Sequence, residues 1–189
     1  MRSINVLLAA LLTTAIGCGS NSTAPSGNNA LKVMLKDSPF SDAKALFVTF
    51  STVSVHLTGG DFVVVPLNGG AMSRTCDLKR LTAAQDVLGT GALTAGHYTQ
   101  IRLIVTNAAL YFDNASTGST PCAVAMAAPA GRSAAVTIPS GQIDLNREFD
   151  VTGTGTTTIT LDFDGDKSIT ETGNGTFMMK PVITVVSVQ

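Results

Sequence analysis

The sequence predicts an all-β domain built as an antiparallel β-sandwich with one or two short helical segments. Three observations favour this class: apolar and polar residues alternate over short runs, glycine-rich turn signals separate the runs, and stretches with helical periodicity are scarce. Ten or more short strands of this kind favour two stacked sheets over a helical or α/β architecture.

The first part of the chain supplies long strands. Residues 31–36 alternate between an apolar face and a face of lysine and methionine, the period-two pattern of a half-buried strand. Residues 45–57 are β-branched and aromatic, and their apolar face changes phase near Thr52, which predicts a β-bulge. Gly59-Gly60 then predicts a hairpin turn into a strand over residues 62–67.

The rest of the chain alternates short strands with turns. Short helical pieces are expected within residues 77–88, and residues 99–105 place alternate side chains on one face of a strand. Gly153-Thr154-Gly155 and Gly173-Asn174-Gly175 predict hairpin turns, because neither leads into a helix as a phosphate-binding loop would. Further strands are expected at residues 123–127, 133–138, 142–145, 148–151, 156–163, 169–172, 176–179 and 182–188. This order suits a Greek-key sandwich of the immunoglobulin-like or transthyretin-like kind, spanning residues 30–189 as one domain.

The amino-terminal segment has the pattern of an export signal. Arg2 precedes an apolar run of about a dozen residues, well short of the roughly 20 that a membrane-spanning helix needs. Residues 11–18, LLTTAIGC, resemble the lipobox of bacterial lipoproteins, whose cysteine becomes the lipidated first residue. The resemblance implies that residues 1–17 are a signal peptide and that Cys18 carries the lipid. An ordinary signal peptide or a buried Cys18 is the alternative.

The predicted anchor sets the expected location. Residues 18–29 would be the lipidated cysteine and a flexible polar tether, and acyl chains would hold the protein at a membrane. Gly19, where inner-membrane lipoproteins have aspartate, implies the outer membrane, facing the periplasm or the cell surface. The formal charge of −1 and the lack of a basic patch argue against nucleic acid as a partner.

Two further cysteines predict a disulfide. If Cys18 carries lipid, Cys76 and Cys122 remain as an even pair in an oxidising compartment. A bridge between them would close a loop of about 46 residues and stabilise the fold by roughly 4 kcal/mol. Two unpaired thiols are the alternative, because the sequence does not show that the sulfur atoms meet.

One acidic cluster is a candidate calcium site. Asp162 and Asp164 share a face of an extended segment, and with Asp166 they would offer the hard oxygen ligands that Ca²⁺ prefers. The spacing departs from an EF-hand loop, since Gly165 comes one place early and Gly173 replaces the bidentate glutamate. The alternative is a strand end closed by Asp-Gly turn chemistry, with Lys167 balancing the charge. No other cofactor is expected.

The titratable residues do not form a recognisable catalytic motif. His56 and His97 lie on different segments, without the serine or cysteine partner of a nucleophilic site, so solvated or capping roles are expected. Glu148 and Asp150 are two residues apart on one predicted strand, an unfavourable arrangement for a glycosidase pair in a chain without tryptophan. Arg102 is expected to pair with an aspartate across the sheet. We therefore expect no enzymatic activity.

Six phrases in order resemble a bacterial family known as domain of unknown function 4382. They are LKVMLKDSPF (31–40), LFVTFSTVSVH (46–56), AGHYTQIRL (95–103), IPSG (138–141), LDFDGDKSI (161–169) and KPVI (180–183). The chain departs from the family pattern in lacking a tryptophan after the strand that ends at His56. The resemblance implies a lipid-anchored β-rich domain of the bacterial envelope and supplies no catalytic residues.

These expectations combine into a functional hypothesis. The chain is expected to be a non-enzymatic envelope domain that binds through its loops, with another envelope protein or a polysaccharide as partner. The alternatives are a calcium-stabilised adhesion or carbohydrate-binding module and, least favoured, a hydrolase.

Overall fold

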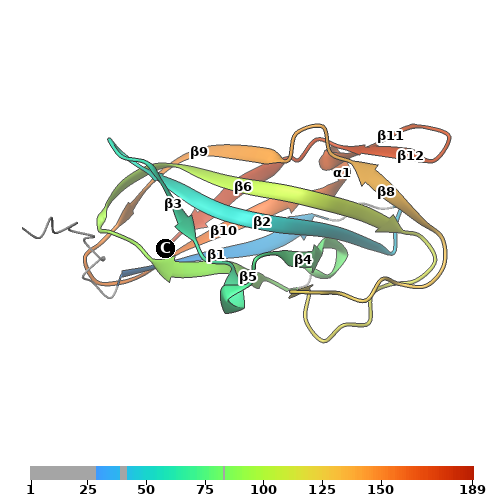
Figure 1. Cartoon of the computed structure of the whole chain (residues 1–189), viewed down its shortest axis with the longest axis horizontal. Helices are drawn as coiled ribbons and strands as arrows, with labels where there is room; N and C mark the ends of the chain where they lie inside the picture. The colour runs from blue at the N-terminus through green and yellow to red at the C-terminus, as the bar shows by residue number, and fades with distance from the viewer. Residues whose placement is uncertain (1–28, 39–41, 83) are drawn as a thin grey trace, which may run out of the picture.

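The computed structural model of the chain describes residues 29–38, 42–82 and 84–189, whose strands form two sheets (Figure 1). The predicted signal peptide, Cys18 and all but the last residue of the predicted tether lie outside the described residues. The smaller sheet has the strand order β13–β10–β1–β5. Its strands are β1 (Asn29–Ser38), β5 (Asp86–Ala92), β10 (Gly155–Asp164) and β13 (Ile183–Val188).

The larger sheet is built on two long central strands, β2 and β6, that run along the length of the molecule (Figure 1). Its order is β11–β12–β8–β6–β2–β4–β7, with β3 also paired to β2 and β9 to β6. Its strands are β2 (Ala45–Leu57), β3 (Phe62–Val65), β4 (Arg74–Asp77), β6 (Gly96–Tyr111), β7 (Cys122–Ala123), β8 (Ser133–Thr137), β9 (Gln142–Val151), β11 (Ile169–Gly173) and β12 (Thr176–Met179). The helical turns are η1 (Asn68–Gly70), η2 (Leu78–Arg80) and α1 (Gly165–Ser168).

The predicted all-β sandwich is confirmed, but two of its pairings are parallel. β1 lies parallel to β10, and β12 lies parallel to β8, while the other pairings are antiparallel. Most strands of the larger sheet lie between β1 and β10 in the sequence. This long connection allows β10 to run in the same direction as β1, which a short turn would not. Residue alternation reports which face is buried and does not report strand direction, so it could not reveal these two pairs.

Several element boundaries differ from prediction. The strand expected at residues 99–105 continues without a break to Tyr111, and the two strands expected at 142–145 and 148–151 are the single strand β9. Of residues 77–88, where short helical pieces were expected, only η2 (Leu78–Arg80) is helical, and residues 86–88 instead begin strand β5. The strand expected at 123–127 ends at Ala123. The predicted hairpin turns at Gly59-Gly60 and 173–175 are confirmed, since β2 pairs with β3 and β11 with β12. The hairpin predicted at 153–155 is wrong: the chain turns there, but it passes from β9 in the larger sheet to β10 in the smaller sheet, and these two strands do not pair in the described residues.

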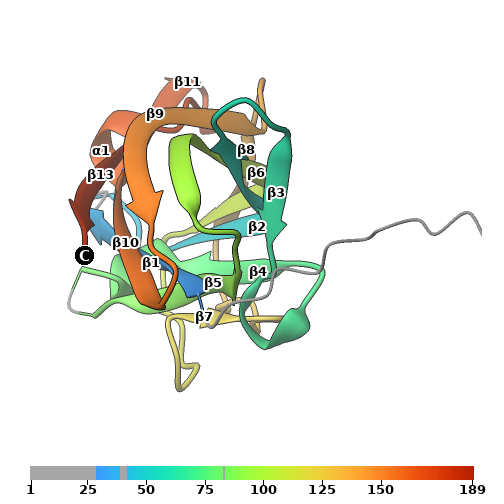
Figure 2. The same cartoon turned by 90° about the vertical axis from the view of Figure 1, so that its left-hand side faces the viewer.

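The core lies between the sheets. Leu31, Val33 and Leu35 on β1 are fully buried, and Ile159 and Leu161 on β10 lie beside them in register. The end-on view shows the strands of the two sheets arranged around a common interior (Figure 2). At roughly 1.5–3 kcal/mol for each large apolar side chain buried, this double layer supplies the main stabilising term.

The bulge predicted near Thr52 is present and keeps β2 apolar toward the core along its whole length. The pairing of β2 with β6 shifts register between Thr49 and Phe50 and again between Phe50 and Thr52. As a result, Phe50 at an even position and Val53 at an odd position are both fully buried. An extra residue in one strand restores the inward face in this way.

The structure contains the predicted disulfide between Cys76 on β4 and Cys122 on β7, which oppose each other in register. The Arg74 guanidinium donates a hydrogen bond of 3.1 Å to the Cys122 carbonyl and lies 3.6 Å from the Asp86 carboxylate of β5. The Cys122 amide also donates to Asp86, at 3.0 Å. These contacts connect the edge of the larger sheet to β5 in the smaller one.

None of the short helices within residues 29–38, 42–82 and 84–189 has the length and apolar character needed to span a lipid bilayer.

Candidate functional site

The predicted calcium ligands are engaged in other contacts. Asp162 pairs with Lys36 on the neighbouring strand β1, at 2.8 Å. Asp164 caps α1, because its carboxylate accepts hydrogen bonds from the backbone amide of Lys167 at 3.0 Å and from its ammonium group at 2.6 Å. These bonds lower the pKa of Asp164. Within the described part of the chain, no three His, Cys, Asp or Glu side chains form a group that could hold a metal. Calcium binding stays a prediction.

A buried carboxyl group that was not predicted lies at the end of β1. Asp37 is 6% exposed and occupies the position after Leu35 in the core-facing row, beside Phe163 of β10. Within the described part of the chain, neither of its carboxyl oxygens has a hydrogen-bond partner. Burial raises the pKa of Asp37 to about 8. Repulsion from Asp162 and Asp164 adds to this rise, whereas the backbone amide of Gly165 and the charge of Lys79 oppose it.

The sequence did contain a signal for this carboxyl group. Positions 31, 33 and 35 face the core, and continuing the same alternation places position 37 there as well. By contrast, the buried Asp77 has a full set of partners: its carboxylate accepts bonds from the amides of Leu46 and Lys79 and from the Ser116 hydroxyl. Asp37 is therefore the carboxyl group in this pair that costs the fold stability.

The histidines and their neighbours take surface roles. His56 shares a hydrogen bond of 3.0 Å with the Thr99 hydroxyl. His97 lies 2.9 Å from the carboxylate of Asp150 and 3.9 Å from that of Glu148, and all three side chains are exposed. The two carboxylates of the rejected glycosidase pair thus flank an imidazole ring instead of facing each other across a cleft.

Arg102 pairs with an aspartate across the sheet, as predicted. Its Nε lies 2.6 Å from Oδ1 of Asp144 on β9, and its guanidinium covers the ring of Phe62 at 3.8 Å. The hydrogen bond from Arg102 lowers the pKa of Asp144, so this carboxylate is ionised at neutral pH. The side-chain amide of Gln142 donates a hydrogen bond of 2.8 Å to the other carboxylate oxygen of Asp144, Oδ2.

Asp144 lies in a groove along the outer edge of β9, which we call the β9 groove. Side chains from residues 139–147 form one wall, and side chains from residues 178–185 form the other. The groove consists of two hollows of about 450 and 350 Å³ that adjoin at Asp144. It follows the seam where β9 of the larger sheet lies beside β13 of the smaller sheet, which the end-on view shows on one side of the molecule (Figure 2).

The larger hollow opens where β12 diverges from β8. β8 and β9 both pair with β6, and a short loop over residues 138–141 separates them. β12 pairs with the end of β8 and then leaves through Lys180 and Pro181 toward β13. Pro139, Ile143, Met178 and Pro181 give this hollow an apolar lining. A volume of this size and character suits an apolar side chain.

The backbone of β9 is available along the groove. In the described part of the chain, β9 pairs with β6 alone. The Val105 amide donates to the Gly141 carbonyl at 2.7 Å, which starts the ladder. Because residues in an antiparallel pair alternate, Ile143 and Leu145 direct their amides and carbonyls to β6, while Gln142, Asp144 and Asn146 direct theirs into the groove. Sequence reasoning missed this site, since its two walls come from separate parts of the chain.

Comparison with known proteins assigns the chain to a family. A family described as Domain of unknown function (DUF4382) matches residues 28–181, most of the chain. The chain belongs to the DUF4382 family. The match confirms the resemblance noted in the sequence. It covers β1 through β12, with one wall of the β9 groove and residues 178–181 of the other wall. No curated protein and no solved structure shows significant similarity to this DUF4382 chain.

Proposed function

We propose that this DUF4382 domain is a non-enzymatic binding domain of the bacterial envelope that engages its partner in the β9 groove. The observation that carries the proposal is the groove itself, where an apolar hollow lies beside a strand edge with free backbone donors and acceptors. Exposed strand edges are usually covered or blunted, so an edge left beside an apolar hollow is suited to recognition.

The proposed location rests on the amino-terminal segment and the disulfide. The lipobox-like residues 11–18 would place lipid on Cys18 and leave residues 19–28 as a spacer before the domain. Disulfides persist mainly in oxidising compartments, and the Cys76–Cys122 bond agrees with export from the cytoplasm. Gly19 favours the outer membrane. The partner is another envelope component, which we take first to be a protein.

Intact-mass analysis of the full chain expressed in a Gram-negative host tests the anchor. We expect the membrane fraction to hold a protein that begins at Cys18 and carries acyl chains, with Cys76 and Cys122 oxidised. The Cys18→Ala variant, which keeps the rest of the chain, should lack both the acyl mass and the amino terminus at position 18. Recovery of wild-type protein that is full-length and unacylated in the cytosol would contradict the proposal. Density-gradient separation of the two membranes tests the outer-membrane assignment.

A further inference from the structure

We propose that the β9 groove receives an extended, acidic segment of a partner protein, which adds to β9 as a new strand. This inference rests on the proposed function, because it assumes that the groove is the binding site, and it specifies the partner's chemistry. The segment would pair with residues 142–146 and place one apolar side chain in the larger hollow, against Met178.

The free backbone groups specify a polypeptide. Gln142, Asp144 and Asn146 each direct an amide donor and a carbonyl acceptor to the groove, and successive presenting residues are spaced by about 6.8 Å along an extended strand. The Gln142 carbonyl also accepts a long hydrogen bond of 3.4 Å from the Ser140 hydroxyl, which an incoming strand would share or displace. A second extended polypeptide repeats donors and acceptors at that spacing. A polysaccharide offers hydroxyl groups at spacings set by its sugar rings, so it would leave part of this series unpaired. Strand addition is the established way to use such an edge.

The hollow beside the edge specifies an apolar side chain. Ile143 is almost fully buried at the base, while Met178 is 40% exposed at the rim. In a strand added to β9, alternate side chains point to the same face, so one side chain of the segment would enter the hollow while its neighbours face solvent. Methionine is flexible and polarizable, which allows the rim to adapt to side chains of different shapes.

The charges along the groove specify an acidic segment. Lys180 lines the larger hollow and Arg147 lines the smaller one, and neither forms an ion pair with a residue in the part of the chain that the structure describes. The carboxylate between them, Asp144, is already paired with Arg102. The two cations therefore leave the groove with complementarity for carboxylates on either side of the apolar residue.

The shape of β9 argues for a short segment from another protein over a second copy of this chain. The pairing of β9 with β6 shifts register between Asn146 and Phe149, which places a bulge at Arg147 and Glu148. Bulges and charged residues interrupt edge-to-edge pairing. The usable edge is thus limited to residues 142–146, and a second β9 would bring Arg147 and Glu148 of its own against it.

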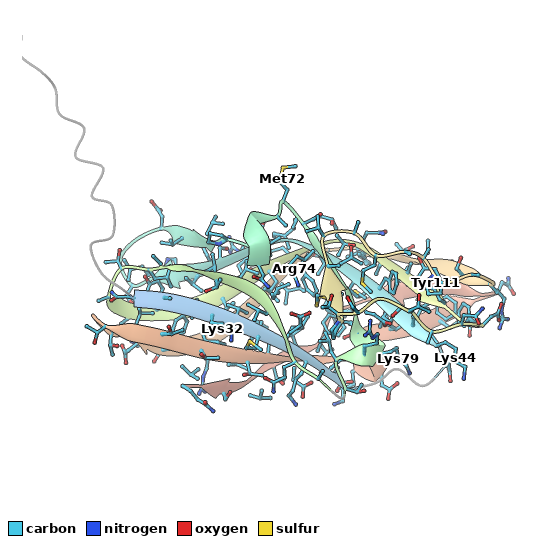
Figure 3. The ribbon with its side chains drawn as sticks, turned by 90° about the horizontal axis from the view of Figure 1, so that it is seen from below. Lys32, Lys44, Met72, Arg74, Lys79 and Tyr111 are labelled. Carbon is cyan, nitrogen blue, oxygen red and sulfur yellow. A yellow bond between two sulfur atoms is a disulfide. The ribbon has the colours of Figure 1, made fainter. Side chains whose placement is uncertain are left out.

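Site-specific photocrosslinking in the native envelope tests the inference. The full lipidated chain would carry benzoylphenylalanine in place of Met178, with the same group in place of Met72 as control. Met72 is 92% exposed and projects from the loop between β3 and β4 (Figure 3). We expect the Met178 position to give a covalent adduct with a second polypeptide at least five-fold above the control. Peptide mapping should place the linked residue in a segment with an apolar residue flanked by Asp or Glu.

A matched pair of variants at Gln142 tests the strand pairing. Gln142→Pro removes one amide donor that points into the groove, and Gln142→Ala keeps that donor while losing the same side chain. Adduct yield should fall at least five-fold for the proline variant and less than two-fold for the alanine variant. Melting curves of both proteins check that each is folded.

Four results would overturn the inference: no adduct above the Met72 control, an adduct with a second copy of the chain, an adduct with lipid or polysaccharide, or equal yields for the two Gln142 variants. These results are separate from the test of the anchor. If the chain is acylated at Cys18 and any of them occurs, the strand-addition inference fails while the anchored domain stands. If the chain is not acylated, the proposed location fails whatever the crosslinks show.

Discussion

The two lateral sides of the sandwich differ in how the sheets meet. On the β5 side, Pro66 and Leu67 of the larger sheet touch the smaller sheet directly: the Thr90 amide donates to the Pro66 carbonyl at 2.9 Å, and Leu67 forms a β-bridge with Gly89. On the β9 side, β9 and β13 lie beside each other without ladder pairing in the described residues, and the groove follows their seam.

The difference follows from the side chains at each seam. A Cβ atom at Gly89 would lie 2.9 Å from the Pro66 carbonyl oxygen, and one at Gly91 would lie 2.6 Å from the Pro66 ring, so glycine permits the closed contact. The β9 side has a bulge and the charged residues Arg147 and Glu148 in the corresponding place. The sheets therefore make direct contact on the β5 side, whereas the β9 side leaves a strand edge without ladder pairing in the described residues, where we propose that a partner binds.

Removal of the disulfide should weaken the closed side most. The bond closes a loop of 46 residues, so the double variant Cys76→Ser/Cys122→Ser should lose about 4 kcal/mol of unfolding free energy. Urea unfolding of the variant measures this, and reduction of the wild type should give a similar loss. An unchanged midpoint in both would show that the β5 side holds without the bond.

The second largest loss of stability is expected from a substitution at Gly89, where the two sheets approach closely. Gly89→Ala would force a Cβ atom against the Pro66 carbonyl, a backbone atom that moves only with β3, and should cost about 1–3 kcal/mol. Gly153→Ala is the control, since a Cβ atom there meets nothing within 4 Å. Thermal unfolding of the two variants compares them, and equal melting temperatures would mean that the close approach at β5 is not needed.

The buried Asp37 carboxyl should make the unfolding free energy of the wild type fall as the pH rises. Well below pH 4, the Asp37 carboxyl is protonated in both folded and unfolded chains. As pH rises toward 8, the unfolded chain ionises while burial keeps the folded carboxyl protonated, so the wild type loses stability. Asp37→Asn removes this loss and should be more stable than wild type by on the order of 2 kcal/mol at pH 8, with a smaller difference at pH 4.

Asp144→Asn is the matched control for that measurement. The pKa of Asp144 is lowered by Arg102, so its contribution to stability is present at neutral pH and is lost as the solution is acidified. The two variants should therefore change stability with opposite signs at pH 8. Chemical unfolding at a series of pH values distinguishes them, and the same sign for both would mean that Asp37 finds a partner in solution.

Substitution on the open side should change stability least. Met178→Gln replaces a rim residue that is 40% exposed, and we expect the unfolding free energy to change by no more than about 0.5 kcal/mol. A loss comparable to that of Gly89→Ala would show that the β9 groove is part of the stabilising core and would weaken its assignment as a binding site.

The sequence predicted features that depend on local alternation and failed where distant segments meet. The inward faces of β1 and β2, the bulge near Thr52 and the glycine turns all follow from neighbouring residues. The parallel partner of β1 and the groove walls depend on which distant strands pair, and alternation does not encode that choice. Asp37 lay within the reach of the pattern, because it continues the buried row of β1.

Among the candidate site residues, the sequence predicted pairs of residues correctly but did not predict how the larger acidic cluster is arranged. The Cys76–Cys122 bond and the Arg102–Asp144 ion pair follow from cysteine parity and from the alternation of charge with apolar residues. The acidic cluster was spaced correctly for a shared face, but Lys36 on β1 lies beside Asp162 and pairs with it, and Asp164 caps a helix. Lys36 is a distant partner that the strand pairing brings beside Asp162, whereas Lys167 is the local partner of Asp164 that the Asp-Gly turn alternative names.

The parallel pairing of β1 with β10 has a consequence for the order of assembly. The first strand, Asn29–Ser38, pairs with residues 155–164 on one side and with β5 on the other. During synthesis or translocation with the amino end leading, most of the polypeptide must emerge before the inner row of the smaller sheet is complete. Such long-range closure slows folding. The amino-terminal strand would thus lack its parallel partner until the last fifth of the chain arrives.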